Sequence, residues 1–306
     1  MTKRGKKLSV TAILGLCLVA GAAVSDPGRA VLKRLFSSSS GETSAVTPGD
    51  AIEEAGQDVE QRARARHGWN AAVINSVMRG QITFYNREGE SVDQANMTLF
   101  RLYSDRMRME LKRGRKVETL GFNQARAWKV GAASVGEAEG RDIRAWMRLW
   151  PERLFVARDK GAGYREAGRR IENFRPARPG QDSAKIEPPK VSEQVVIEDS
   201  IGSSPPQGET ADRRFVTYYV DRDTQLVEAA RWLEPDDPRR SIDDPETPRV
   251  DVRVDFADWR DVNGVWLPFE VTRWTGGKIA LRIQLSEVQL NQPLSNSLFS
   301  PATNTR

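Results

Sequence analysis

Alternating apolar and polar residues run through the C-terminal part of the chain. In the run VDVRVDF, residues 250–256, valine and phenylalanine alternate with charged residues, which is the pattern of a strand with one dry and one wet face. The following runs are separated by Asn263-Gly264 and Gly276-Gly277, dipeptides that accept the positive φ angles of tight hairpin turns. The sequence therefore predicts an antiparallel meander of three strands, whose dry face must be covered by another part of the chain.

The same two-residue period recurs earlier in the chain, after a predicted helix. Asp50 and Glu53 have the spacing of a helix N-cap motif, and good helix formers continue through about Val73. Strands are expected near residues 78–84, 95–99, 106–111, 117–122, 125–130, 164–174, 215–220 and 226–233. With the C-terminal runs this makes about 10 or 11 strands without alternating helices, which indicates a mainly β fold with a few covering helices.

Residues 136–159 interrupt the strand pattern. Ile143, Trp146 and Trp150 recur at spacings of three and four, the period of one helix face, and Pro151 bends or restarts the helix. A helix so rich in tryptophan and methionine must lie on an apolar surface. Two interpretations stay open: the helix fills the core of the sheet, or it is a lid, because methionine and tryptophan repack around ligands of different shapes.

The N-terminus has the pattern of an export signal. Basic residues between positions 3 and 7 precede an uncharged stretch, Leu8 to Val24, which ends in small residues. We interpret residues 1–25 as a signal peptide or, if uncleaved, as a signal anchor in the inner membrane through residues 8–24. In both cases the remaining chain is expected outside the cytoplasm. Cys17 lies within the apolar stretch, so the exported part is expected to have no disulfide.

Changes in composition mark the boundaries of the folded part. Residues 26–50 include the run Ser37 to Ser40 and have the composition of a flexible linker. Residues 51–302 are interpreted as a single domain. Two polar, proline-containing stretches within it, 175–212 and 235–248, are interpreted as loop insertions, because a domain boundary there would leave the sheet incomplete. Within the first stretch, only residues 195–197 have a short strand pattern.

Composition argues against nucleic acid as a partner. The chain of 306 residues is 39% hydrophobic and 29% charged, which is the balance of a globular protein. Its 47 basic and 42 acidic residues give a net charge of +5, and part of this surplus lies in the N-terminal leader. A dedicated nucleic-acid-binding surface is therefore not expected. The basic residues between positions 101 and 116 are interpreted as wet-face positions of strands, with a patch for an acidic partner or an anionic membrane as the alternative.

Little in the sequence points to catalysis. His67 is the only histidine, and without an exported cysteine neither a Cys/His nucleophile pair nor a histidine-rich metal site is expected. Asp221, Asp223 and the aspartates between positions 236 and 244 are interpreted as turn residues, with acid–base chemistry or calcium binding as the alternative. We therefore expect no enzyme, no metal and no cofactor.

Several short motifs add to the order of elements. They are Gly80, Gly121 and Trp128 in GFNQARAWKV, the hairpin YYVDRDTQLVEA with Asp221 and Thr224, and the C-terminal runs NGVWLPFEV and VQLNQPLSNSLFSP. With these motifs the chain resembles, over residues 51–302, the outer-membrane lipoprotein carrier superfamily with LolA-like and LolB-like folds. The resemblance implies a strongly curved, unclosed antiparallel β-barrel whose concave apolar face is covered by the N-terminal helix and the Trp-rich helix. It also implies a cavity for acyl chains of lipoproteins or related amphiphiles in the periplasm.

The dry-face positions of these elements are the candidates for lipid binding. They are Ile82, Phe84, Leu99, Met107, Met109, Trp128, Trp146, Met147, Trp150, Val252, Val254, Leu267, Phe269, Leu281 and Ile283. An ordinary core role is the alternative for each of them. Burying an acyl chain gives about 0.8 kcal/mol per methylene, so a dry groove binds such a chain without any catalytic group.

These observations predict a non-catalytic protein of the cell envelope that binds acyl chains of lipids or lipoproteins. Its expected role is transport between membranes, with an acylated lipoprotein or lipid as cargo and a handoff partner in the inner or outer membrane. Two alternatives stay open. One is a membrane-tethered periplasmic sensor or regulator with the same fold, and the other is a structural envelope protein whose helices fill the concavity completely.

Overall fold

The computed structural model describes residues 48–300 apart from 71, 104, 124–125, 133, 173–189, 202–211 and 238–245. The predicted signal segment and nearly all of the predicted linker lie outside the described residues.

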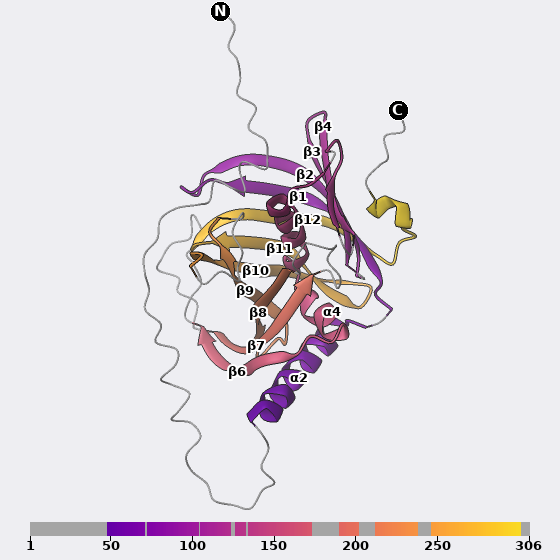
Figure 1. Cartoon of the computed structure of the whole chain (residues 1–306). Helices are drawn as coiled ribbons and strands as arrows, with labels where there is room; N and C mark the ends of the chain where they lie inside the picture. The colour runs from indigo at the N-terminus through magenta and orange to yellow at the C-terminus, as the bar shows by residue number, and fades with distance from the viewer. Residues whose placement is uncertain are drawn as a thin grey trace, which may run out of the picture.

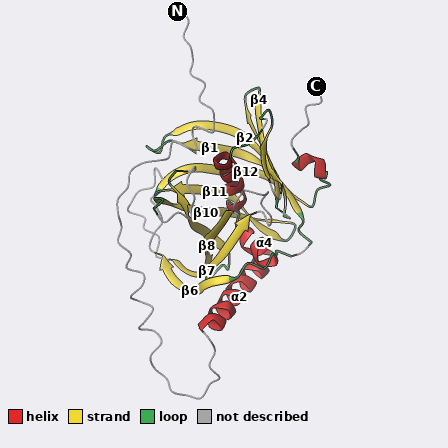
Figure 2. Cartoon of the chain, in the orientation of Figure 1, coloured by secondary structure: helices red, strands yellow, loops and turns green. Residues whose placement is uncertain are grey.

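One antiparallel sheet organises the described chain (Figure 1, Figure 2). Its twelve strands follow the order β5-β4-β3-β2-β1-β12-β11-β10-β9-β8-β7-β6. The strands are β1 (Asn75–Tyr85), β2 (Ser91–Leu102), β3 (Arg106–Arg113), β4 (Lys116–Asn123), β5 (Arg126–Lys129), β6 (Tyr164–Glu172), β7 (Lys190–Ile201), β8 (Asp212–Asp221), β9 (Val227–Pro235), β10 (Arg249–Val262), β11 (Val265–Thr275) and β12 (Lys278–Leu290). Since β1 pairs with β12, the consecutive strands β5 and β6 are left as the two edges. The predicted fold class, a curved and unclosed antiparallel sheet with covering helices, is confirmed.

The prediction of a loop over residues 175–212 is wrong in its middle part. Strand β7 occupies Lys190–Ile201 and pairs with both β6 and β8. The hydrophobic pattern did not predict this strand, because Glu193 and Asp199 share a face with Val195 and Ile197 and break the apolar alternation. The other residues of this stretch lie mostly outside the described part of the chain.

The second predicted loop, 235–248, follows β9 directly. Its described residues 236–237 and 246–248 belong to no helix or strand. The backbone N–H of Asp236 donates to the carbonyl of Pro248 at 2.9 Å, which brings the two ends of this loop together.

The predicted C-terminal meander is confirmed as β10, β11 and β12. Asn263 and Gly264 have φ angles of 57° and 83°, and Gly276 and Gly277 have φ angles of 57° and 77°. Two consecutive positive φ angles are the geometry of a tight type I′ hairpin turn, whose twist matches that of the flanking strands. The two dipeptides therefore set the register of this half of the sheet.

The N-terminal helix α2, Pro48–His67, packs against β6, β7 and β11. It was expected to reach about Val73 but ends earlier, because Gly68 takes a φ of +65°. A Cβ atom at this position would lie 1.9 Å from the carbonyl oxygen of Gly264, so only glycine fits here. The C-terminal end of α2 therefore lies against the β10–β11 turn.

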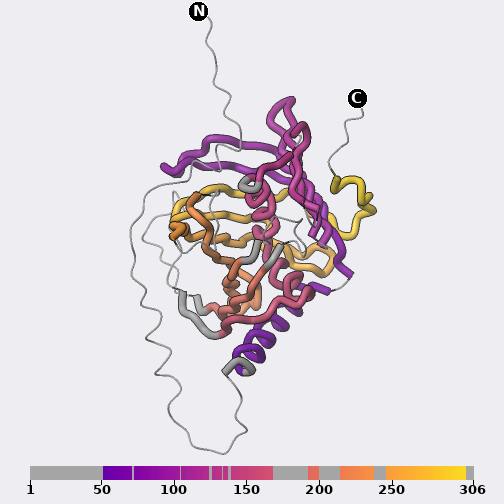
Figure 3. Tube along the Cα trace, in the orientation of Figure 1, coloured from indigo at the N-terminus to yellow at the C-terminus, as the bar shows by residue number. Residues whose placement is uncertain are grey.

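The second helical region lies between the two edge strands. It consists of α3 (Glu137–Ala145), the short helix η1 (Trp146–Arg148) and α4 (Arg153–Asp159), with the break at Pro151 as expected. Figure 3 shows this magenta segment running through the middle of the curved sheet. A last short helix, η2 (Asn296–Phe299), lies beside β3 and β4. Among the described residues, no helix combines the length and the apolar character needed to cross a membrane.

Candidate functional site: the covered concave face

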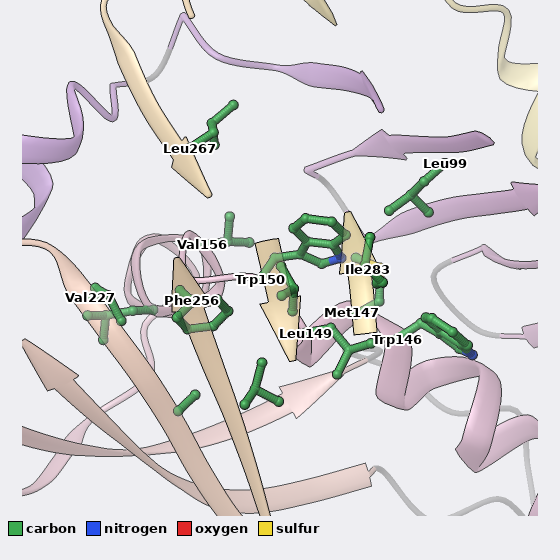
Figure 4. Close-up of a cluster of buried hydrophobic side chains, with 14 of the residues drawn as sticks. Leu99, Trp146, Met147, Leu149, Trp150, Val156, Val227, Phe256, Leu267 and Ile283 are labelled. Carbon is green, nitrogen blue, oxygen red and sulfur yellow. The ribbon is translucent and has the colours of Figure 1, made fainter. Parts of the chain in front are cut away.

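The predicted lining residues come together in one place. All of them except Trp128 belong to a single buried apolar cluster, which combines the concave face of the sheet with the second helical region. The cluster draws on strands from both halves of the sheet, including Leu99 of β2, Ile283 of β12 and Val252 of β10. The sequence pattern therefore identified one contiguous surface. Its side chains are packed against each other in this structure (Figure 4).

Trp128 does not belong to this surface. It pairs with Gly121, whose neighbours Leu120 and Phe122 point into the core cluster, so Gly121 and Trp128 face the convex side. The indole Nε1 donates to the carbonyl of Phe299 at 3.0 Å, and the ring lies where a Gly121 side chain would be. The prediction that Trp128 lines the concave face is wrong. Successive residues of a strand point to opposite faces, and in β5 it is Ala127 that packs against the cluster.

The second helical region covers the concave face together with α2, whose Val59 and Ala63 belong to the same cluster. We call residues 137–159, comprising α3, η1 and α4, the cover. Trp146, Met147 and Trp150 project from it into the apolar cluster and are 5%, 2% and 0% exposed. Figure 4 shows Trp150 and Met147 beside Ile283. Because the cover connects β5 to β6, it runs from one edge of the open sheet to the other.

The α4 end of the cover is held by buried charges. The buried ion cluster consists of Arg101, Asp105, Arg148, Glu152, Arg153 and Asp199, all at most 2% exposed. Arg153 donates to Asp199 from Nε at 3.0 Å and from Nη2 at 2.5 Å, and to Asp105 from Nη1 at 2.9 Å. Arg148 Nε lies 3.4 Å from Asp199 Oδ2, and Arg101 donates to Glu152. Lys160 donates to Asp105 at the border of the cluster.

The ion cluster joins distant parts of the sheet. Arg101 lies on β2 and Asp199 on β7, and six strands separate β2 from β7 in the sheet order. Their partners Glu152 and Arg153 are adjacent residues of the cover. The cover therefore ties the two halves of the curved sheet together. Burial would lower the pKa of Arg153, but the neighbouring carboxylates of Asp199 and Asp105 raise it, so its charge is retained.

Two tyrosines line the same region. Tyr103 donates its hydroxyl to Ser76 at 3.1 Å, and its ring lies 5.0 Å from the guanidinium carbon of Arg101. Burial, and the charge of Glu152, raise the pKa of Tyr103. Burial, and the charge of Asp199, raise the pKa of Tyr218. Both hydroxyls are therefore protonated donors at neutral pH.

The α3 end of the cover also carries charged contacts, and its Arg144 is buried at 6% exposure. Lys129 of β5 lies 3.3 Å from Glu139 of α3 and 2.8 Å from Glu118, and all three side chains keep contact with solvent. Burial, together with the charge of Glu234, raises the pKa of Asp142 to about 6, while Arg273 acts in the opposite direction. Partly exposed ion pairs contribute about 0–1 kcal/mol each, much less than is lost when a buried pair is broken.

His67, the only histidine of the chain, is part of the packing beneath α4. Its Nδ1 lies 3.1 Å from the carbonyl of Trp266, and its Nε2 accepts the backbone N–H of Val227 at 3.1 Å. This pair of bonds requires the neutral tautomer with the proton on Nδ1. Burial lowers the pKa of His67 to about 4, against a weaker opposing effect of the Trp266 carbonyl. The side chain is therefore a structural link and has no metal-ligating geometry.

Asp221 and Asp223, two of the carboxylates considered for chemistry, lie in a turn, whereas Asp243 and Asp244 lie outside the described residues. Asp221 Oδ1 accepts the backbone N–H groups of Asp223 and Thr224 at 2.9 Å and 2.7 Å and the Thr224 hydroxyl at 3.0 Å. This is an Asx turn at the β8–β9 hairpin. Within the described ranges, no group of three or more His, Cys, Asp or Glu side chains is arranged to hold a metal ion.

Sequence reasoning missed the buried ion cluster. The cover contains three charged residues, Arg148, Glu152 and Arg153. They lie among tryptophan and leucine residues and do not form a separate polar helix face. That lack of a polar face was the available signal, because a charged residue inside an otherwise apolar helical stretch has to be paired when it is buried. The acidic partners could not be identified, since Asp105 lies in a turn and Asp199 in a stretch expected to be a loop.

The structure defines the class of the protein as an unclosed antiparallel half-barrel whose concave face is covered by helices. A scan against protein-family models and a search of the curated proteins found no match.

Similar solved structures include a putative outer membrane lipoprotein-sorting protein domain from Vibrio parahaemolyticus, with 9% identity, a TM-score of 0.45 and coverage of 80% of this chain and 97% of that one. A LolA superfamily protein from Nitrosomonas europaea has 10% identity and a TM-score of 0.42, with coverage of 80% and 97%. A DUF1329 family protein from Desulfovibrio piger has 12% identity and a TM-score of 0.42, with coverage of 81% and 97%.

Proposed function

We propose that the protein binds acyl chains of a lipid or lipoprotein on its concave face, in the periplasm, and that the cover moves to admit them. The observation that carries this proposal is the continuity of the apolar surface beneath the cover. Side chains of β1, β2, β3, β10, β11 and β12 meet there, and the cover shields them without any strand closing the sheet. Binding needs no catalytic residue, because removal of apolar surface from water is the driving force.

An opening that leaves the buried ion cluster intact would displace the cover away from α4. Displacing α4 would break buried ion pairs of Arg153 and Glu152, and displacing α3 would break the Lys129–Glu139 contact and the interactions of the buried side chain of Arg144. An acyl chain of about 16 carbons gains roughly 12 kcal/mol on complete burial at about 0.8 kcal/mol per methylene. Such a gain can offset the loss of the apolar contacts that Trp146 and Met147 make in the closed form.

The first test is native mass spectrometry of the protein purified from a cell-envelope fraction, combined with lipid extraction. Co-purifying acyl lipid or lipoprotein supports the proposal. Replacement of Trp146 and Trp150 by charged residues is expected to remove it. A protein that carries no lipid and takes up no fluorescent fatty-acid probe contradicts the proposal and favours the structural alternative, in which the helices fill the concavity permanently. The close packing of the cluster is the observation in favour of that alternative.

A disulfide lock tests the movement of the cover. A Cβ atom built on Gly140 of α3 would lie 3.6 Å from Cβ of Ala127 on β5. This is within the range of roughly 3.5–4.5 Å found for disulfides. The double variant Gly140→Cys/Ala127→Cys, made in a Cys17→Ser background, is expected to lose uptake of a fatty-acid probe when oxidised and to regain it on reduction. Each single cysteine variant is the matched control. Equal uptake by the oxidised and reduced forms would show that α3 need not move.

A further inference from the structure

The turn between β3 and β4 carries positive charge that is not neutralised. Residues 112–116 include four basic side chains. Arg113 is paired with two carboxylates, at 2.7 Å and 3.2 Å. Lys112, Arg115 and Lys116 are exposed, and none of the three side chains makes an ion pair or a hydrogen bond with the described part of the chain. We call residues 112–117 the basic tip.

Exposed apolar residues adjoin these cations. Val117 is 56% exposed and Val130 is 42% exposed. Val117 is paired with Lys112 across the β3–β4 ladder, so the two side chains share the convex face. The backbone N–H of Val130 donates to the carbonyl of Thr119 at 2.9 Å, which places Val130 diagonally beside Val117. The end of the β3–β4 hairpin therefore presents aliphatic side chains next to free cations.

Other arginines of the convex face are paired with carboxylates. Arg79 lies 2.9 Å from Glu287, and Arg231 lies 2.6 Å from Asp251. Such pairs leave little net field, whereas three neighbouring cations without counter-charges produce a local positive potential. Figure 1 shows β3 and β4 extending past β2 at the top of the view. The positive potential is therefore presented on a projecting end of the sheet.

The composition of the tip selects a class of partner. The partner has to offer negative charge with an apolar layer next to it, and the surface of an anionic membrane offers both. A protein interface fits less well, because lysine is depleted there and a standard interface buries roughly 800 Å² on each side. Two of the three free cations are lysines, and the end of one hairpin is small for such an area.

We infer that the basic tip binds the surface of an anionic lipid membrane, with Lys112, Arg115 and Lys116 at the headgroups and Val117 at the boundary of the acyl region. This inference goes beyond the proposed function, because the tip lies outside the concave face and binds a bilayer whether or not that face holds a lipid. Helix α3 packs against β4 and β5. Contact at the tip would therefore bring the α3 end of the cover close to the bilayer.

A fluorescent label at Val117 tests the contact directly. Val117→Cys, in a Cys17→Ser background, is labelled with the environment-sensitive dye NBD in the protein as recovered from a cell-envelope fraction. Vesicles of phosphatidylcholine are compared with vesicles that also contain about 30% phosphatidylglycerol. We expect stronger, blue-shifted emission with the anionic vesicles alone, reversed at about 0.5 M NaCl because salt screens exposed charges. A label at Leu233→Cys, also on the convex face and 45% exposed, is expected to show no change.

Replacing the free cations tests their contribution. The labelled protein carries Lys112→Gln, Arg115→Gln and Lys116→Gln together. Each cation near an anionic bilayer contributes about fivefold to binding, so the half-maximal response is expected at about hundredfold more lipid. An unchanged response in this variant overturns the inference, because the cations then do not contact the membrane.

A matched control removes the same net charge elsewhere. Arg126, Arg222 and Lys278 are exposed and lie outside the tip, and all three are replaced by glutamine in the labelled protein. We expect the half-maximal lipid concentration to change by less than about threefold, because only long-range attraction is lost. A loss as large as in the tip variant shows that net charge, and not the tip, controls binding, and overturns the assignment.

Soluble polyglutamate separates a membrane from an acidic protein. It offers carboxylates without an apolar layer, so we expect no shift in the emission of the Val117 label. A shift equal to that with anionic vesicles overturns the membrane assignment and favours an acidic protein partner. Equal responses to both kinds of vesicle, or no response to either, also overturn the inference. The tip variant is expected to take up the fatty-acid probe normally, so failure of the proposed function and failure of the tip are measured separately.

Discussion

Replacing Asp199 by asparagine is expected to destabilise the protein strongly, because it removes a charge from the centre of the buried ion cluster. Asp199 is fully buried, and its carboxylate accepts from Arg153 through Nε and Nη2. Arg148 faces the same carboxylate at 3.4 Å. Asparagine keeps the shape of the side chain but offers no negative charge to either guanidinium group.

The expected loss follows from the environment of the pair. Removing one partner of a buried ion pair costs about 3–5 kcal/mol, since the remaining charge stays buried without full compensation. The loss is larger than for a surface pair, where it is about 0–1 kcal/mol. For a domain of this size, each kcal/mol corresponds to about 2–4 °C in the melting temperature. The variant Asp199→Asn is therefore expected to melt about 10 °C lower.

The assay is urea denaturation followed by tryptophan fluorescence, together with a thermal melt. Asp251→Asn is the matched control: Asp251 accepts from Arg231 at 2.6 Å, but both side chains are about 40% exposed. We expect a loss of at most about 1 kcal/mol in the control. Equal and small losses in the two variants would refute the argument that buried charges hold the α4 end of the cover.

Two further predictions concern other contacts of the sheet. Gly121→Ala places a Cβ atom 2.3 Å from the Trp128 ring, so a loss of about 1–3 kcal/mol is expected in urea denaturation, against little change for Gly163→Ala, where no atom lies within 4 Å. For His67, the folded-state pKa of about 4 lies below the ordinary value of about 6.5, so stability falls by up to about 3 kcal/mol as the pH decreases from about 6.5 to about 4. His67→Gln, which removes this titration, is expected to show a flatter dependence of the urea midpoint on pH over that interval, and an unchanged slope would contradict the assignment.

Most strands of the sheet could be predicted from the sequence, because one face of each is apolar and buried and the other is exposed to water. Alternation identified β1 to β3 and β10 to β12, and the paired turn residues at Gly264 and Gly277 fixed the C-terminal hairpins. The same alternation failed at β7, where inward-facing positions are charged. Periodicity reports burial of apolar residues, so a strand whose buried face carries carboxylates is read as a loop.

The sequence could predict which residues form the candidate surface, but it could not predict the contacts between them. Spacing placed Trp146 and Trp150 on one helix face, and this is where they are buried. The orientation of Trp128 depended on the parity of β5, a strand of four residues that is too short for a reliable alternation. The pairing of Arg153 with Asp105 and Asp199 joins residues 48 and 46 positions apart, and local sequence carries no information on such contacts.

The topology limits how the concave face can open. Because the cover is continuous with both edge strands, it cannot leave the sheet as a separate body, and any opening has to be a local displacement between fixed points. Opening at α4 would break the buried ion cluster, and opening at α3 would break the partly exposed contacts of Lys129 and the interactions of the buried Arg144. The segment between them carries Trp146 and Met147, the apolar side chains that an acyl chain would replace. In this closed form the same side chains keep the apolar surface of the sheet out of water, so any opening has to be compensated by the molecule that takes their place.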